Sequence, residues 1–267
     1  MGGAMTVDDL PIRRVRLEVE ELAFTRPSGD LFGPMSFSVH TDEILGVIGP
    51  TGAGKGDLVD LLCGRQMARA GAIKLDGQRI DMLPAHARSR LGLVMVAGSA
   101  PALPDVTVHD WLAMSIQLVD RSPLQLLLRG RRRLDSRQIG DIEATLQFCS
   151  LHHVAGDSLA SLTPAQRRMT EIARGLCQRP RLLLLHRPLA GLPRMHRHDF
   201  SLVLRDIAAE AVSMVVIDEQ LDALATLCQR FIVLQRGHLV ASGSLDVLGS
   251  NQAAMQAFTG TAPGKVA

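Results

Sequence analysis

The chain has 267 residues, of which 46% are hydrophobic and 21% charged, enough for one large α/β domain with a full-sized core. A formal net charge of +2 favours neither nucleic acid nor an anionic membrane as a partner, and 3% aromatic residues argue against a base-stacking surface. The four cysteines form no CxxC pair, which argues against a metal site or disulfides and favours a reducing cytosol.

The first third of the chain predicts antiparallel strands followed by a buried parallel strand. Val15–Val19 and Met35–Val39 alternate between apolar and polar residues, as half-buried strands do. Residues 44–49, ILGVIG, form the nearly continuous apolar run of a buried parallel strand. A helix is expected over residues 57–65, and a short strand with a tight Asp-Gly turn over residues 72–77.

The rest of the chain predicts further strands separated by helices. Residues 91–96, 181–186 and 213–218 are apolar strands, and residues 230–243 read as a strand, a turn and a second strand. Residues 108–178 have mostly helical periodicity. Strands that alternate with helices imply a largely parallel sheet wrapped by helices, and the helical middle is large enough to be a subdomain. No apolar run approaches the roughly 20 residues that span a bilayer.

The stretch GPTGAGK has the composition and setting of a phosphate-binding loop. Its glycines let the backbone curl so that N–H groups point at phosphate oxygens, and Lys55 reaches the terminal phosphates. The loop follows an apolar strand and precedes a helix, which is the context that separates such a loop from a chance match. The candidate nucleotide-binding residues are Gly49, Pro50, Thr51, Gly52, Ala53, Gly54, Lys55, Gly56 and Asp57.

Around this loop the sequence resembles the ATP-binding subunits of ABC transporters. The similarity covers nearly the whole chain and is carried by LEVEEL, MSFSVHTDEILGVIGPTGAGK, AIKLDGQRI, LPDVTV, EIARGLCQRPRLLLLHRPLAGLP and VLQRGHLVASGSLDVL. The helical middle and the AMQAFTG tail look most like subunits of the branched-chain amino-acid and urea importers.

The resemblance implies an α/β fold of the P-loop NTPase type. Its parts would be a mostly parallel core sheet, an antiparallel β subdomain and an inserted α-helical subdomain at about residues 100–178. A single ABC domain is expected over residues 15–260, with residues 1–14 and 261–267 disordered. ATP as ligand, integral-membrane permease subunits as partners, and a cytoplasmic position on the inner face of the cell membrane are also implied.

The phosphate loop departs from the family directly after Lys55. The family has a Ser or Thr there, whose hydroxyl ligates Mg²⁺, whereas Gly56 offers no side chain. Asp57 places a negative charge close to the expected phosphates, and two unit charges about 4 Å apart repel by roughly 4 kcal/mol at an effective dielectric near 20.

The other catalytic motifs depart from the family as well. His186 and Arg187 replace the metal carboxylate and the general base, and arginine cannot accept a proton at neutral pH. Glu219 stands in place of the switch histidine, and Pro193 in place of the D-loop aspartate. Ungapped alignment puts Gly98 at the glutamine that senses Mg²⁺.

The family's signature LSGGQ is also altered. Thr163 keeps a hydroxyl, but Pro164 removes an N–H donor and Ala165 adds a methyl group. For the aromatic residue that stacks on adenine, Phe24 is near, while ungapped alignment puts Arg26 at the position. The signature-like residues are Leu162, Thr163, Pro164, Ala165 and Gln166.

These departures predict that Mg²⁺-dependent hydrolysis is lost and that no catalytic residue remains. One hypothesis is that Asp57 pairs with Lys55, His186 or Arg187 and fills the place of the metal, and the alternative is that these side chains point at water. His196 and His198 lie near His186, but their spacing does not favour a metal site.

Three functional hypotheses follow. In the first, the chain is a pseudo-ATPase subunit of an ABC importer that pairs with an active ATPase subunit and docks on a permease. The alternative is a nucleotide-sensing or regulatory module outside transport, and the third is an active ATPase with unusual ligands. ATP binding is expected to be weak and independent of Mg²⁺, and no nucleic acid is expected. The basic run Arg129–Arg133 is either a solvated connector or a contact for phospholipid or nucleic acid.

Overall fold

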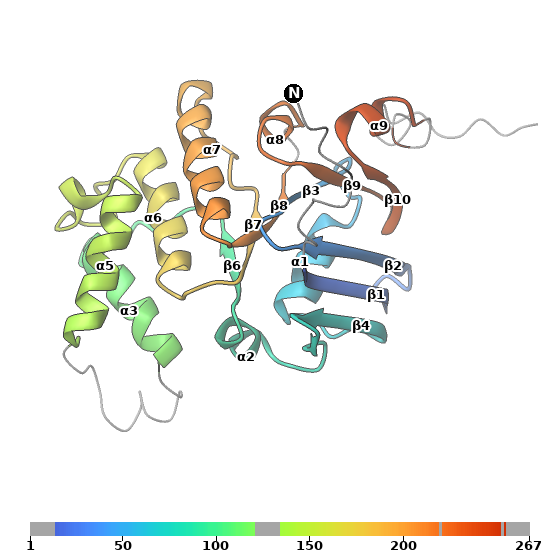
Figure 1. Ribbon diagram of the computed structural model, residues 1–267, viewed down its shortest axis with the longest axis horizontal. Helices are drawn as coiled ribbons and strands as arrows, with labels where there is room; N and C mark the ends of the chain where they lie inside the picture. The colour runs from blue at the N-terminus through green and yellow to red at the C-terminus, as the bar shows by residue number, and fades with distance from the viewer. Residues whose placement is uncertain (1–13, 121–133, 219–220, 252–253, 255–267) are drawn as a thin grey trace, which may run out of the picture.

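The computed structural model describes residues 14–120, 134–218, 221–251 and 254. Among these residues, a four-stranded sheet has the order β2-β1-β4-β5, and a six-stranded sheet has the order β10-β9-β3-β8-β7-β6 (Figure 1). The strands are β1 (Val15–Thr25), β2 (Leu31–His40), β3 (Ile44–Ile48), β4 (Ala70–Leu75), β5 (Gln78–Arg79), β6 (Leu93–Ala97), β7 (Leu182–His186), β8 (Ser213–Ile217), β9 (Arg230–Gln235) and β10 (His238–Gly243).

The helices pack around the six-stranded sheet. Figure 1 places α1 between that sheet and the antiparallel strands β1, β2 and β4, and places α3, α5 and α6 on the far side. The described helices are α1 (Lys55–Cys63), α2 (Ala85–Arg90), α3 (Val108–Asp120), α5 (Ser136–Phe148), η2 (His152–Val154), α6 (Pro164–Leu176), α7 (Arg194–Ala209), α8 (Leu221–Ala225) and α9 (Leu245–Gly249). The predicted α/β fold class is thus confirmed.

The core of the larger sheet is parallel. β3 pairs in parallel with β8 and β9, and β7 pairs in parallel with β6 and β8. All five residues of β3 are buried, as are all five of β8, because helices or the second sheet cover both faces. The carboxyl ends of β3 and β7 therefore lie at one edge of the sheet, where the glycine-rich loop and the His186–Arg187 segment emerge.

Some element bounds differ from the sequence predictions for identifiable reasons. β1 continues to Thr25 because register shifts between Val19 and Leu22, and between Leu22 and Phe24, interrupt the alternation without ending the strand. β6 begins at Leu93 because Gly92 has a φ of +101° after the short helix α2, which the periodicity did not indicate.

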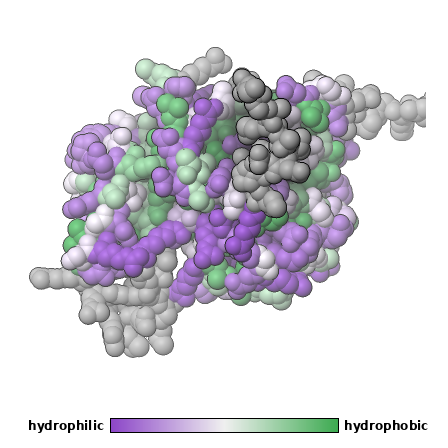
Figure 2. Space-filling model, in the orientation of Figure 1, coloured by the Kyte–Doolittle hydropathy of each residue, from purple (hydrophilic) through white to green (hydrophobic). Residues whose placement is uncertain are grey.

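The helices of the middle third share a core of their own. Leu112 of α3, Ile142 of α5 and Ala173 of α6 are completely buried in one apolar cluster. The basic run Arg129–Arg133 lies outside the described residues. Within residues 14–120, 134–218 and 221–251, no helix combines the length and apolarity that crossing a membrane requires. Figure 2 shows a band of hydrophilic residues across the lower half of one face of the molecule.

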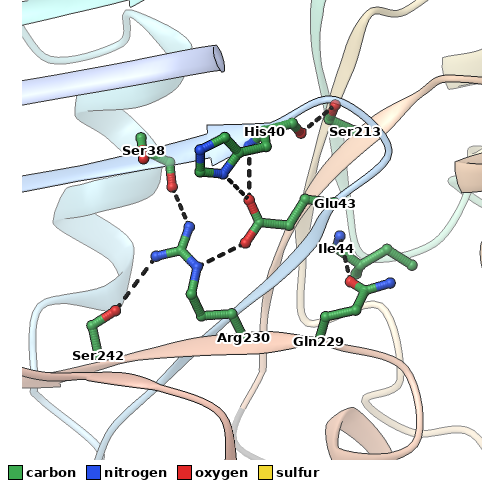
Figure 3. A network of polar contacts seen from close by, with 8 residues as sticks. All are labelled: Ser38, His40, Glu43, Ile44, Ser213, Gln229, Arg230 and Ser242. Atoms are coloured by element: carbon green, nitrogen blue, oxygen red, sulfur yellow. Dashed lines mark hydrogen bonds and ion pairs between the residues drawn. The ribbon is translucent and has the colours of Figure 1, made fainter. Parts of the chain in front are cut away.

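A buried carboxylate joins strands from both sheets (Figure 3). Glu43 is 4% exposed and accepts hydrogen bonds from Arg230 Nε at 2.8 Å and from the backbone N–H of His40 at 2.7 Å. Burial acts to raise the pKa of Glu43, but the bonds from Arg230 and His40 outweigh it, so the pKa lies below its ordinary value. Arg230 also donates to the carbonyl oxygen of Ser38, so one ionised group ties β2 to β9.

Candidate functional site: a phosphate-loop cavity

The glycine-rich loop has the backbone conformation that its glycines permit. Gly52 and Gly54 have φ values of +81° and +101°, in the left-handed region that favours glycine. A Cβ on Gly49 would lie 2.3 Å from the carbonyl oxygen of Leu234, and one on Gly54 would lie 2.7 Å from Nη2 of Arg26. The loop leads into α1, which begins at Lys55, two residues earlier than the sequence predicted.

Lys55 closes the loop on itself. Its ammonium group donates to the carbonyl oxygens of Gly49 at 2.6 Å and Pro50 at 2.9 Å, and the residue is 8% exposed. A phosphate that engages this ammonium therefore has to compete with contacts inside the loop.

Asp57 is held by Arg26. Both Nε and Nη2 of Arg26 donate to Oδ2 of Asp57, at 2.9 and 2.7 Å. The guanidinium also lies over the ring of Phe32, 5.4 Å from its centroid. The hypothesis of an ion pair at Asp57 named the wrong cation, because the chain folds Arg26 back onto α1, where it pairs with Asp57.

His186 and Arg187 face the loop from the end of β7. Arg187 has a φ of +53°, and its N–H donates to the carbonyl oxygen of Ile217 at 2.6 Å. Arg168 of α6, which is 9% exposed, donates to the carbonyl oxygens of Arg187 and Ala190 and so fixes this turn. Burial, and then the charge of Arg187, lower the pKa of His186, which favours its neutral form near pH 7.

These elements enclose a cavity of about 470 Å³. Its described lining includes two carboxylates, each of which is ion-paired: Asp57 with Arg26 at 2.7 Å, and Asp60 with Arg65 at 2.6 Å. With His186 neutral, the three permanent cations and two carboxylates of the lining give a formal charge of +1. The lining residues are Arg26, Gly52, Gly54, Lys55, Gly56, Asp57, Asp60, His186 and Arg187.

The donor set of this cavity does not fit Mg²⁺. That ion prefers oxygen ligands from carboxylates, hydroxyls and water. Gly56 supplies no side-chain oxygen, the carboxylates of Asp57 and Asp60 are each paired with an arginine, and the other charged or polar side chains of the described lining are two arginines, a lysine and an imidazole. In the part of the chain that the structure describes, no three histidine, cysteine, aspartate or glutamate side chains group to hold a metal ion. The curled backbone and Lys55, in contrast, suit a phosphate group.

The signature-like residues lie elsewhere. Thr163 is the N-cap of α6, where its hydroxyl accepts from the N–H of Gln166 at 3.3 Å, and Pro164 occupies the first turn. Neither these three residues nor Leu162 and Ala165 line the cavity. Thr163 also donates to Oε1 of Gln166 at 2.9 Å, so the hydroxyl serves the helix cap.

The remaining predicted positions are spread around the site. The N–H of Gly98 approaches the carbonyl oxygen of His186 at 3.4 Å, but Gly98 does not line the cavity. Pro193 is the N-cap of α7, whose residues His196 and His198 are exposed. Glu219 lies outside the described residues.

A strand–loop–helix unit with a curled glycine loop at the carboxyl edge of a parallel sheet defines a P-loop nucleotide-binding protein. Residues 32–190, more than half of the chain, match the family model described as ABC transporter. The chain therefore belongs to the ABC transporter family, as an ATP-binding subunit, and in that family such subunits partner with membrane permease subunits.

Similar proteins serve transport in both directions. The lipopolysaccharide export system ATP-binding protein LptB of Haemophilus influenzae is 25% identical over 245 residues, covering 91% of this chain and 97% of that protein. The hemin import ATP-binding protein HmuV of Pseudomonas entomophila is 28% identical over 226 residues, covering 83% and 84%. The fold is similar to that of MJ1267, an ATP-binding cassette of an ABC transporter in its ADP conformation, with a TM-score of 0.83, 20% identity and coverage of 92% and 99%.

Proposed function

We propose that this chain is a pseudo-ATPase subunit of an ABC transporter, which keeps the nucleotide-binding fold but does not hydrolyse ATP. The observation that carries the proposal is the cavity at the phosphate loop, where each lining carboxylate is paired with an arginine. Hydrolysis in this family needs a metal ligand and a base, and the groups at those places are Gly56, His186 and Arg187. Arginine stays protonated at any physiological pH, so it cannot activate water.

Nucleotide binding by this cavity is proposed to be weak and independent of Mg²⁺. The backbone donors of the loop and Lys55 favour phosphate. The carboxylate of Asp57 opposes it, as does the need to displace the contacts of Lys55 with Gly49 and Pro50. Arg187 supplies positive charge at a place where the family relies on a metal-binding site, so a divalent ion adds little.

The proposed assembly contains an active ATPase subunit beside this one, on a pair of permease subunits. Two copies of this chain would combine two impaired sites, whereas a heterodimer leaves turnover to the partner. The proposed role in import, in the branched-chain amino-acid and urea branch, rests on the sequence of the helical middle and the tail. The proposed location is the cytoplasmic face of the cell membrane.

The test is an ATP and ADP titration by calorimetry, with Mg²⁺ and with EDTA, beside a phosphate-release assay. We expect dissociation constants in the range of about 0.1–1 mM that EDTA leaves unchanged, and no phosphate release above that of a Lys55→Ala variant. Sub-micromolar ATP binding that EDTA abolishes, or Mg²⁺-dependent phosphate release that Lys55→Ala removes, would refute the proposal.

A co-purification experiment tests the assembly. Expression with an intact ATPase subunit and permease encoded nearby should yield one complex whose ATPase activity survives Lys55→Ala in this chain. Co-purification of the chain with a non-membrane partner alone would instead favour the alternative of a nucleotide-sensing or regulatory module outside transport.

A further inference from the structure

A second cavity, of about 490 Å³, lies at the opposite edge of the six-stranded sheet from the phosphate loop. Arg181 directly precedes β7, and Gly92 directly precedes β6, so the cavity is at the amino ends of these parallel strands. β7 has five residues, which separate its two ends by roughly 16 Å at about 3.3 Å per residue. The lining residues are Arg14, Leu75, Asp76, Gln78, Arg90, Leu91, Gly92, Gln178, Arg179 and Arg181.

The charge of this cavity is strongly positive. Its described lining holds four arginines and one aspartate, a formal charge of +3, which exceeds the net charge of +2 on the whole chain. The phosphate-loop cavity, at +1, is less cationic. A concentration of like charge around a concave surface raises the local concentration of anions.

The single carboxylate of the lining is already engaged. Asp76 accepts from Arg16 Nη1 at 2.7 and 2.9 Å and from Arg181 Nη1 at 3.0 Å. The Arg16 and Asp76 side chains are 14% and 11% exposed, whereas the side chain of Arg181 is 62% exposed. Arg16 therefore anchors Asp76, and the exposed guanidinium of Arg181 has N–H groups that are accessible to a ligand.

The four arginines come from three separate places in the chain. Arg14 precedes β1, Arg90 ends α2, and Arg179 and Arg181 lie in the turn between α6 and β7. Arg179 pairs with Asp141 of α5 at 2.6 Å, and Arg90 belongs to the end of a helix that Leu91 caps. Packed secondary-structure elements thus hold the arginines around one cavity.

We propose that this cavity binds a ligand carrying two or more phosphate groups, at a site separate from the phosphate loop. Guanidinium forks match phosphate oxygens in a bidentate manner, and arginines spread around a cavity engage several phosphates at once. The source of the phosphates is either a free phosphorylated molecule or the headgroup of an anionic lipid.

The test uses tripolyphosphate as the probe, titrated by calorimetry into the full chain with EDTA present. Because the phosphate loop also attracts phosphate, the titration is repeated on Lys55→Ala. We expect binding to persist in Lys55→Ala, and the dissociation constant to rise at least tenfold when Arg14→Gln and Arg181→Gln are added. Arg181→Lys should fall between, because lysine keeps the charge and loses the fork.

Arg69→Gln is the matched control. Arg69 is exposed and directly precedes β4, at the end of that strand away from the cavity, and the substitution removes the same charge. Its affinity for tripolyphosphate should equal that of the parent. Thermal unfolding of each variant checks the fold, which Arg181→Gln should preserve because Arg16 still holds Asp76.

A vesicle sedimentation experiment distinguishes a lipid headgroup from a free phosphorylated molecule as the source of the phosphates. Vesicles of phosphatidylcholine with cardiolipin, whose headgroup carries two phosphate groups, should pull down Lys55→Ala but not its Arg14→Gln/Arg181→Gln derivative if the ligand is a lipid, and should leave both in solution if it is a free molecule. The proposal is overturned if Lys55→Ala binds neither probe, or if the arginine variants bind as their parent does. These outcomes differ from failure of the pseudo-ATPase proposal, which concerns hydrolysis at the other edge of the sheet.

Discussion

Replacing Asp57 by asparagine should tighten the binding of phosphate ligands to the loop. Asp57 lies at the start of α1, and its Oδ2 accepts both bonds from Arg26. The change removes a negative charge and releases a guanidinium that already lies beside Gly54. At an effective dielectric near 20, a unit charge about 8 Å from a phosphate contributes roughly 2 kcal/mol, and partial neutralisation by Arg26 reduces this to about 1 kcal/mol. That free energy corresponds to an increase in affinity of roughly five- to tenfold.

The assay is an ADP titration by calorimetry in EDTA, on the parent and on Asp57→Asn. The control is Asp30→Asn in the β1–β2 hairpin, where the carboxylate accepts from the hydroxyl of Ser28 at 2.8 Å and does not line the cavity. The control should bind ADP as the parent does. Unchanged or weaker binding by Asp57→Asn would show that Asp57 and Arg26 do not limit access to the loop.

Three further predictions concern stability and pH. Glu43→Gln should lower the free energy of unfolding by about 2–3 kcal/mol at pH 7, since Arg230 is left without a buried anion. Because the pKa of Glu43 is lowered by folding, this contribution is present above the ordinary value of 4.5 and lost as pH falls through the folded pKa, so the difference between denaturant melts of the two proteins should shrink as pH is lowered below 4.5. Arg88→Lys should cost at least about 2 kcal/mol in the same melts, because the buried guanidinium donates to four carbonyl oxygens that lysine cannot all reach. As pH falls, the phosphates of ADP gain protons and bind less well, while His186 gains charge as pH passes through its lowered pKa, so the affinity for ADP should fall less steeply in the parent than in His186→Asn, where only the phosphates titrate.

The parallel core was predictable because strands that are buried on both faces have continuous apolar sequences. β3, β7 and β8 appear as continuous apolar runs, and each was placed within one or two residues. The extent of β1 was not predictable from alternation, since its register shifts break the period of two while the strand continues beside β2 and β4. The short helix α2 leaves too brief a pattern for periodicity to reveal.

The candidate site was predictable in its backbone and less so in its charges. The loop and the His186–Arg187 segment follow strands of one parallel sheet, so their meeting at one edge follows from topology. The partner of Asp57 does not, because Arg26 is 31 residues away and reaches α1 through the fold of the β1–β2 hairpin. Arg168 carried no local signal either, since its role depends on carbonyl oxygens that the turn after β7 exposes.

Contacts within the protein hold the phosphate loop in its conformation. The loop is tied to the β9–β10 hairpin by a hydrogen bond from the N–H of Gly237 to the carbonyl oxygen of Ala53 at 2.8 Å. Lys55 and the close approach of Gly49 to Leu234 add two more internal contacts. These contacts need no nucleotide, so the conformation of the loop serves the packing of α1 between the two sheets whether or not a phosphate binds.

The same reasoning applies to charge around the loop. In a metal-dependent site, carboxylates are balanced by a divalent ion, and removing the ion leaves repulsion between them. Here Arg26 and Arg65 balance the carboxylates of Asp57 and Asp60 within the protein. On the proposal that hydrolysis is lost, restoring a single catalytic residue would leave Arg187 facing the loop, so the proposed replacements around Gly56 form one electrostatic unit rather than independent losses.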